Sequence, residues 1–134
     1  MKLDHLGIAV PNLESALVFW RDALGLELSD VEVVESEGVR TAFLPAGEAS
    51  IELLEPLGDE GVIAKYLAKS GPGLHHICFE VDGIEKTLES LDAAGVRLVD
   101  RKPRPGAHGK KVAFLHPKAS SGVLVELSEP GDKA

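Results

Sequence analysis

The sequence predicts an α+β fold built from two tandem βαβββ modules, and two observations lead to this prediction. The first is an internal repeat, because four segments of the N-terminal half return in the same order in the C-terminal half. The second is the order of local patterns, which is the same in both halves: a strand-like alternation, a helical spacing of apolar residues, and three more apolar stretches. Together these observations indicate a duplication with small differences in loop length.

The repeat is carried by short apolar segments that keep their order along the chain. The matched pairs are HLGIAV (5–10) with HICFEV (76–81), DALGLEL (22–28) with DAAGVRL (92–98), FL (43–44) with FL (114–115), and SIELLEP (50–56) with LVELSEP (124–130). Most positions in each pair keep their apolar or polar character, so equivalent segments are expected to form equivalent elements.

The first module shows a strand, a helix and three further strands. Residues 3–10 alternate as a strand does, and Pro11 and Asn12 supply a stop and a helix cap. Apolar residues then recur at helical spacing as far as Gly25, which stands where a left-handed helix end is favoured. The three stretches expected to form the remaining strands are 26–34, 39–44 and 50–54.

The second module repeats this order after residue 74. Asp82 and Glu85 have the spacing of a capping box, so we expect the helix to begin there, and Gly95 is expected to end it. The stretches expected to form the three remaining strands are 96–99, 111–116 and 123–127.

The domain organisation follows from the size of the modules. A chain of 134 residues is about the size of one domain. We therefore expect a single domain over residues 1–134, with modules at approximately 1–56 and 74–130. The connector 57–73 is expected to contain a helix over 60–69, because apolar residues recur there at helical spacing before SGPG breaks the pattern. A module of about 60 residues buries too little surface to be stable alone, so the two are expected to share a core.

Composition excludes several classes of protein. The apolar fraction of 44% is ample for a core, and the formal charge of -8 disfavours nucleic acid and anionic membrane as partners. The start of the chain lacks the apolar run of a signal peptide, and no segment is long enough to span a bilayer. The single Cys78 cannot form a disulfide within the chain. We expect a cytoplasmic protein.

Four polar residues stand out because of the faces they occupy. Side chains alternate across a strand, so His5 and His76 point away from the side that packs on the helices. The same alternation turns Glu52 and Glu126 away from the apolar residues on either side of them. The repeat therefore supplies one imidazole and one carboxylate from each module at equivalent positions.

These four side chains suit a divalent metal. A lone strand histidine is usually a hydrogen-bonded structural residue, and a lone glutamate on a half-exposed strand is usually solvated. Taken together, however, two imidazoles and two carboxylates form a mixed nitrogen and oxygen set that suits Co²⁺, Mn²⁺, Zn²⁺ or Ni²⁺. If a pseudo-twofold axis relates the modules, His5, Glu52, His76 and Glu126 converge in a metal-binding cleft between mixed sheets.

The other histidines, the cysteine and the basic loop are weaker candidates for a functional site. His75 and His116 are interpreted as structural or supporting residues, and Cys78 as a small buried apolar group. The loop 101–111 is basic in an otherwise acidic protein, and it contains Arg101, Lys102, Arg104, Lys110 and Lys111. It is either a solvated loop or a contact for phosphate or carboxylate groups.

Longer stretches of the chain resemble a known superfamily. HLGIAVPNLESAL, GLHHICFEVD and GAHGKKVAFLHPKASSGVLVEL all look like segments of the vicinal oxygen chelate superfamily, which includes glyoxalase I and extradiol dioxygenases. The likeness is closest to the methylmalonyl-CoA epimerase family, and it covers essentially the whole chain.

The resemblance implies a paired βαβββ fold, a divalent metal that is often cobalt, and epimerisation of methylmalonyl-CoA at C2 by proton abstraction through an enolate. It puts metal ligands at His5, His76 and Glu126, with Glu52 where relatives have Gln or Glu. Some relatives have a catalytic Glu on the second module strand, where this chain has Thr41. Family members often form homodimers, so a homodimer is expected.

For the chemistry itself, we expect Glu126 to act as one base and the second role to fall to Glu52, Glu48 or a metal-bound water. Lys110 and Lys111 are the expected contacts for the CoA substrate. Two alternatives remain open: an isomerase of the glyoxalase I type (lactoylglutathione lyase), which would use the same metal set, and a metal-free protein that binds a small molecule.

Overall fold

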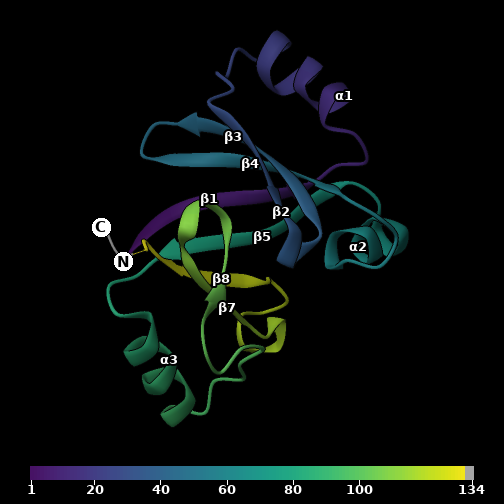
Figure 1. The fold of residues 1–134 in the computed structure, drawn as a ribbon. Helices are drawn as coiled ribbons and strands as arrows, with labels where there is room; N and C mark the ends of the chain where they lie inside the picture. The colour runs from purple at the N-terminus through teal and green to yellow at the C-terminus, as the bar shows by residue number, and fades with distance from the viewer. Residues whose placement is uncertain (132–134) are drawn as a thin grey trace. The chain divides into compact units, whose positions relative to one another are not determined.

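The computed structural model describes residues 1–131, and the chain divides into two compact units. The N-terminal unit is His5–His75, and the C-terminal unit comprises Met1–Asp4 and the chain from His76 onward. Each unit mixes helices with a four-stranded stretch of mixed sheet, so the predicted α+β class is confirmed (Figure 1). Within residues 1–131, no helix has the length and apolar character needed to cross a membrane.

The N-terminal unit has the strand order β2-β3-β4-β1, with β1 and β4 parallel and the other neighbours antiparallel. In the elements given next, η1 is a short π-helix and η2 is a 3₁₀ turn. The elements are β1 (Lys2–Ala9), α1 (Leu13–Leu17), η1 (Val18–Ala23), β2 (Asp30–Val34), η2 (Glu35–Glu37), β3 (Val39–Ala46), β4 (Ala49–Pro56) and α2 (Val62–Ser70).

Helix α1 begins as the sequence predicts. The Oδ1 atom of Asn12 accepts a hydrogen bond from the N–H of Ser15 at 2.9 Å, which satisfies one of the donors left free in the first turn. Leu13 and Leu17 are buried against one face of the sheet in a core with Leu44 and Leu53. The predicted helix is not uniform, because after Leu17 the α-helix gives way to the π-helix η1. Gly25 follows η1 with a φ of 97°, as expected for a residue that ends a helix.

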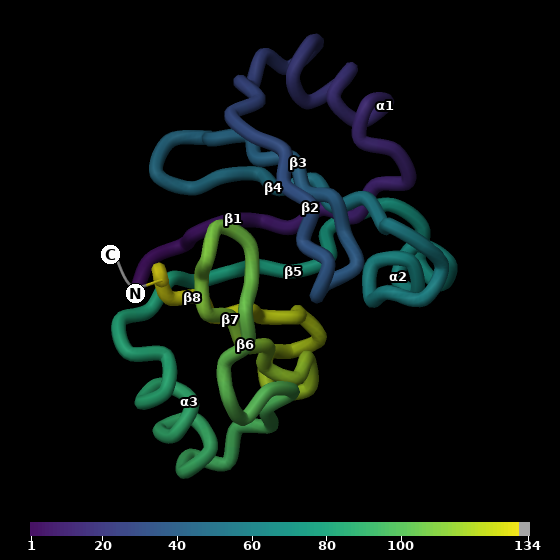
Figure 2. The backbone as a smooth tube through the Cα atoms, in the orientation of Figure 1, coloured from purple at the N-terminus to yellow at the C-terminus, as the bar shows by residue number. Residues whose placement is uncertain are grey.

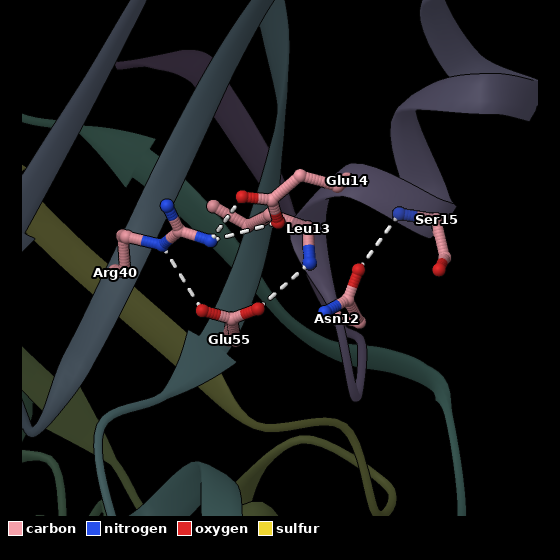
Figure 3. Close-up of polar contacts among 6 residues, drawn as sticks. All are labelled: Asn12, Leu13, Glu14, Ser15, Arg40 and Glu55. Atoms are coloured by element: carbon pink, nitrogen blue, oxygen red, sulfur yellow. Dashed lines mark hydrogen bonds and ion pairs between the residues drawn. The ribbon is translucent and has the colours of Figure 1, made fainter.

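Glu55 and Arg40 make further polar contacts that fix the start of α1 (Figure 3). The Oε2 atom of Glu55 in β4 accepts a hydrogen bond from the N–H of Leu13 at 2.8 Å. Arg40 in β3 binds Glu55 through Nε at 3.0 Å and Glu14 through Nη2 at 2.8 Å. These contacts hold the first turn of α1 to β3 and β4, and the pKa of Glu14 is lowered, mainly by its hydrogen bond with Arg40.

Helix α2 is the predicted connector helix. Its Ile63 is buried with Ala9, Val39 and Leu54 in a separate cluster. Ile8 and Leu53 pack in the α1 core. Ala9 and Leu54 are the next residues along the same strands, so their side chains point to the opposite face of the sheet. Both faces of the sheet in the N-terminal unit are therefore partly covered, one by α1 and the other by α2.

The C-terminal unit has the strand order β5-β8-β7-β6, with β5 and β8 parallel. Its 3₁₀ turns, η3 and η4, lie before and after β7. The elements are β5 (Gly73–Glu80), α3 (Ile84–Ala93), β6 (Arg104–Pro105), η3 (Ala107–Gly109), β7 (Lys111–Leu115), η4 (Pro117–Ala119) and β8 (Val125–Glu129). Figure 2 follows the backbone through β6 and β7.

Helix α3 forms as expected but begins differently. The predicted capping box of Asp82 and Glu85 is wrong, because the N-cap residue is Gly83, which has a φ of 77° and no side chain to accept a hydrogen bond from the first turn. The N–H of Gly83 is bound instead by the carboxylate of Glu129 at the end of β8. Ile84 and Leu88 are buried and pack with the apolar residues of β7 and β8.

The predicted strands at 26–34 and 96–99 are shorter than expected. Residues 26–29 precede β2; Ser29 donates its N–H to the carbonyl of Phe43 in β3 at 2.9 Å, whereas Leu26 and Leu28 pack against the α1 core. In the stretch 96–99 only Leu98 forms a bridge, with Leu115, and the strand beside β7 is the two-residue β6. Prolines at 103 and 105 lack the N–H that a longer strand would need.

Candidate metal centre

The two units repeat the same strand register around the candidate ligands. In the N-terminal unit Glu52 of β4 is paired with Gly7 of β1 on one side and Phe43 of β3 on the other. In the C-terminal unit Glu126 is paired with Cys78 and Phe114, which are the repeat equivalents of Gly7 and Phe43. The predicted sequence repeat is therefore also a repeat of strand pairing.

In the N-terminal unit the structure brings His5 and Glu52 together. The Nδ1 atom of His5 lies 2.8 Å from the Oε2 atom of Glu52. The two residues are only 6% and 7% exposed. Ile51 and Leu53 pack toward α1, so the predicted orientation of Glu52, away from that core, is confirmed.

In the C-terminal unit the equivalent residues form an equivalent pair. The Nε2 atom of His76 lies 3.1 Å from the Oε1 atom of Glu126. These residues are also 6% and 7% exposed. The rings of His76 and Phe114 are nearly perpendicular, in a T-shaped arrangement with ring centres 5.8 Å apart, so an aromatic side chain helps to shield this pair.

Each pair has donor chemistry that suits a divalent metal. A carboxylate buried to this degree is costly unless it is paired, and the neighbouring imidazole supplies a partner. Imidazole nitrogen and carboxylate oxygen are both ligands of divalent transition metals. Each unit thus offers one nitrogen and one oxygen donor, and the donor set fits a divalent metal.

Three other residues singled out by the sequence have structural contacts. The Nδ1 atom of His116 accepts a hydrogen bond from the N–H of Lys118 at 3.0 Å and caps η4. The pKa of His116 is lowered, first by burial and then by Arg97 and Lys118. His75 packs edge-on against Tyr66, and Cys78 is fully buried, which agrees with an inert thiol.

The candidate bases differ in their exposure. Glu48 is exposed in the turn between β3 and β4, whereas Glu52 is buried beside His5. Thr41 is 2% exposed in β3 and has no ionisable group. Of the residues considered for the second base, Glu52 is therefore the one with a buried carboxylate.

The two lysines expected to bind substrate are held by ion pairs. The Nζ atom of Lys110 lies 3.1 Å from the Oδ2 atom of Asp4, and that of Lys111 lies 3.3 Å from the Oε2 atom of Glu85. Sequence reasoning missed Phe43 and Phe114 as neighbours of the glutamates. Their place in the repeat was the available signal.

Comparison with known proteins identifies the relatives of this chain. The family described as Glyoxalase/Bleomycin resistance protein/Dioxygenase superfamily matches residues 4–114. The mitochondrial methylmalonyl-CoA epimerase of Dictyostelium discoideum is 44% identical over 129 residues, covering 96% of this chain and 78% of that protein. The ethylmalonyl-CoA/methylmalonyl-CoA epimerase of Cereibacter sphaeroides is 43% identical, covering 96% and 97%.

A solved structure extends the comparison to the fold. A methylmalonyl-CoA epimerase in complex with methylmalonyl-CoA and NH4+ superposes with a TM-score of 0.90 at 36% identity. The match covers 96% of this chain and 94% of that one.

Proposed function

The chain belongs to the methylmalonyl-CoA epimerase family of the glyoxalase superfamily, and on this basis we propose that it interconverts the two C2 epimers of methylmalonyl-CoA. The observation that carries the proposal is the buried histidine and glutamate pair that occurs once in each unit, in the same strand register. A structural role alone would not require the same two residue types at equivalent positions in both modules.

The proposal includes a divalent metal held by His5, Glu52, His76 and Glu126, with Co²⁺ as the first choice among Co²⁺, Mn²⁺, Zn²⁺ and Ni²⁺. The support is the donor set, which combines two imidazoles and two carboxylates that are all less than a tenth exposed. When bound, such a metal would stabilise the negative charge that develops on the thioester oxygen.

Glu126 is the proposed base for one face of C2. C2 is bonded to both the thioester carbonyl and a carboxylate, so its C–H bond is acidic. The proton moves to a Glu126 oxygen while the electron pair of the C–H bond moves onto the thioester oxygen. Burial beside His76 and Phe114 keeps water away from this carboxylate. A proton is then delivered to the opposite face of C2, and the buried Glu52 is the proposed carrier.

Lys110 and Lys111 are the proposed contacts for the CoA part of the substrate. Their support is chemical, because both place an ammonium group within a basic segment of an acidic protein. A homodimer and a cytoplasmic location complete the proposal. Size-exclusion chromatography with light scattering tests the dimer.

The glyoxalase I type alternative uses the same donors but acts on a glutathione hemithioacetal. It has less support, because the relatives with the coverage described above are epimerases. Assaying both substrates side by side distinguishes them. The metal-free binding alternative has less support, because a protein that holds no metal does not require four buried donors in a repeated arrangement.

One experiment tests the proposal directly. The purified protein is incubated with methylmalonyl-CoA in D₂O, and deuterium incorporation at C2 is followed by mass spectrometry. We expect exchange that EDTA abolishes and Co²⁺ restores. Absence of exchange after reconstitution with each of the four metals would overturn the epimerase proposal, and substoichiometric metal throughout would favour the binding-protein alternative.

A further inference from the structure

The plane of the His76 imidazole depends on a neighbouring side chain as well as on β5. The last side-chain torsion of a histidine has a broad energy profile, so the strand fixes where the ring begins but not how far it turns. The ring stands nearly perpendicular to that of Phe114, with ring centres 5.8 Å apart. In this orientation Nε2 of His76 lies 3.1 Å from Oε1 of Glu126. The placement of the Phe114 ring therefore bears on the geometry of the donor pair.

Phe114 is itself held by a cation. It is only partly buried, whereas its repeat equivalent Phe43 is 7% exposed. The guanidinium carbon of Arg104 lies over the Phe114 ring, 5.3 Å from its centre. A cation within about 6 Å of the centre of an aromatic ring is attracted to the ring face. Arg104 thus covers part of a ring that the core does not enclose.

Asp100 ties Arg104 and Phe114 together. Its Oδ2 atom accepts a hydrogen bond from the N–H of Phe114 at 2.9 Å and lies 3.4 Å from Nε of Arg104. The N–H of Asp100 also donates to the carbonyl of Phe114 at 3.1 Å. Pro103 and Pro105 flank Arg104 and restrict its backbone. The cation, the ring and the carboxylate therefore form a closed set in which each partner limits the movement of the other two.

The repeat indicates that the fold alone does not require this cation. In the C-terminal unit Arg104 is paired across the sheet with the residue two positions before Phe114. In the N-terminal unit the residue two positions before Phe43 is paired with Glu32. The two modules thus keep the same histidine and glutamate donors but carry opposite charges at this equivalent position. A role for Arg104 is therefore to be sought in the donor pair of its own module.

We propose that Arg104 is a positioning residue of the candidate metal centre, acting through Phe114 to hold the imidazole of His76 in the plane that faces Glu126. This role rests on the proposed function, because it concerns the proposed metal site, and it deepens that function by naming a residue outside the donor set. A ligating imidazole depends on its neighbours for its orientation, so loss of the cation is expected to weaken metal binding. Electrostatics alone predicts the opposite, because removing a positive charge favours binding of another cation.

The test measures Co²⁺ binding by calorimetry and the absorption spectrum of the bound ion. We expect Arg104→Ala to raise the Kd for Co²⁺ about 10-fold and to change the spectrum. Arg104→Lys keeps a cation that can lie over the ring, so it is expected to recover most of the loss. Arg101→Ala is the matched control, because it removes the same charge from the same segment, where Arg101 is exposed and binds Asp92 of α3 at 3.2 Å. Its Kd is expected to stay within about 2-fold of that of the unchanged protein.

A second variant shows whether Arg104 acts through Phe114. Phe114→Leu removes the ring and leaves the cation, and we expect a similar loss of Co²⁺ affinity. The double variant is then expected to bind Co²⁺ no more weakly than Phe114→Leu alone, because both changes interrupt the same contact. Additive losses, an unchanged Kd in Arg104→Ala, or an equal rise in Arg101→Ala would overturn the assignment.

A readout in the metal-free protein separates failure of this proposal from failure of the proposed function. Proton–nitrogen NMR correlations of the histidine rings report the tautomer and surroundings of each imidazole. In Arg104→Ala we expect the His76 signals to shift, the His116 signals to stay, and the urea midpoint to remain near that of the unchanged protein. Unchanged His76 signals, or shifts of both rings with a lowered urea midpoint, would contradict a positioning role. If the protein binds no Co²⁺ or epimerises no substrate, this comparison alone decides.

Discussion

The Nε2 atom of His76 lies 3.1 Å from the Oε1 atom of Glu126 in the C-terminal unit, and the Nδ1 atom of His5 lies 2.8 Å from the Oε2 atom of Glu52 in the N-terminal unit. The two contacts differ in which imidazole nitrogen faces the carboxylate. The paired residue types and register repeat, but the ring orientation does not, so the two glutamates are distinguishable and need separate tests.

Replacing Glu126 by Gln removes the proposed base while keeping the shape of the side chain. We expect deuterium exchange at C2 of methylmalonyl-CoA to fall by about 10²- to 10⁴-fold, the usual contribution of a general base. Mass spectrometry of the recovered thioester measures it. Glu80→Gln is the control, because Glu80 is a half-buried carboxylate of β5 that pairs with Lys2. Retained exchange in one epimer only would assign the lost step to Glu126 and the retained step to another base.

Replacing Glu52 by Gln separates a ligand role from a base role. The amide keeps an oxygen donor, so we expect the metal content to stay near that of the unchanged protein, whereas Glu52→Ala loses metal. If Glu52 is the second proton carrier, exchange through one face of C2 is lost in Glu52→Gln despite the bound metal. Metal analysis together with exchange from each separate epimer checks this. Full exchange from both epimers would transfer the role to another group.

A prediction about the hydrophobic core concerns Leu53 of β4, which is fully buried against α1. Leu53→Ala leaves a cavity, and we expect the free energy of unfolding to fall by about 2–5 kcal/mol. Urea denaturation followed by circular dichroism measures it. Val18→Ala is the comparison, because Val18 is 60% exposed and its truncation is expected to change stability by less than about 0.5 kcal/mol. Similar effects for both would contradict the core assigned here.

The pH prediction concerns His116, whose neutral ring accepts the Lys118 N–H. Burial, Arg97 and Lys118 lower its pKa, so the folded protein binds this proton less readily than the unfolded chain. Its stabilising contribution is therefore present above the ordinary histidine pKa of about 6.5 and is lost as the pH falls through the lowered value. His116→Asn keeps a capping acceptor that does not titrate.

We expect the urea midpoint of the unchanged protein to fall relative to that of His116→Asn as the pH is lowered below about 6.5. Comparing the two proteins at each pH removes the contribution of the other titrating groups. A difference that does not vary with pH would show that His116 does not contribute through its neutral form.

The sequence predicted most of the fold, because the elements follow strong local patterns. Asn12 caps α1, Gly25 and Gly95 end their helical segments with positive φ, and the alternation around Glu52 and Glu126 has the predicted faces. The repeat also pointed to His76 in place of its neighbour His75, which packs on Tyr66.

The errors have physical causes that are not local. The start of α3 depends on Glu129, which lies far along the chain, so a capping pattern read from neighbouring residues could not find it. The stretch 96–99 has the apolar character of a strand, but it contacts β7 only through an isolated bridge and a few backbone hydrogen bonds, and a local pattern does not show how many residues a neighbouring strand will pair with. The contact of Arg104 with Phe114 likewise depends on the tertiary fold of the hairpin.

The partners in each histidine and glutamate pair lie on neighbouring parallel strands, whereas the basic residues of 101–111 lie mostly on the segment between α3 and β7. Strand pairing is stiff and tolerates few changes, but surface loops accept substitutions and insertions readily. Natural variation can therefore change the surface segments while leaving the donors in place, so descendants of one duplicated ancestor can diverge in the molecules they bind sooner than in their donor set.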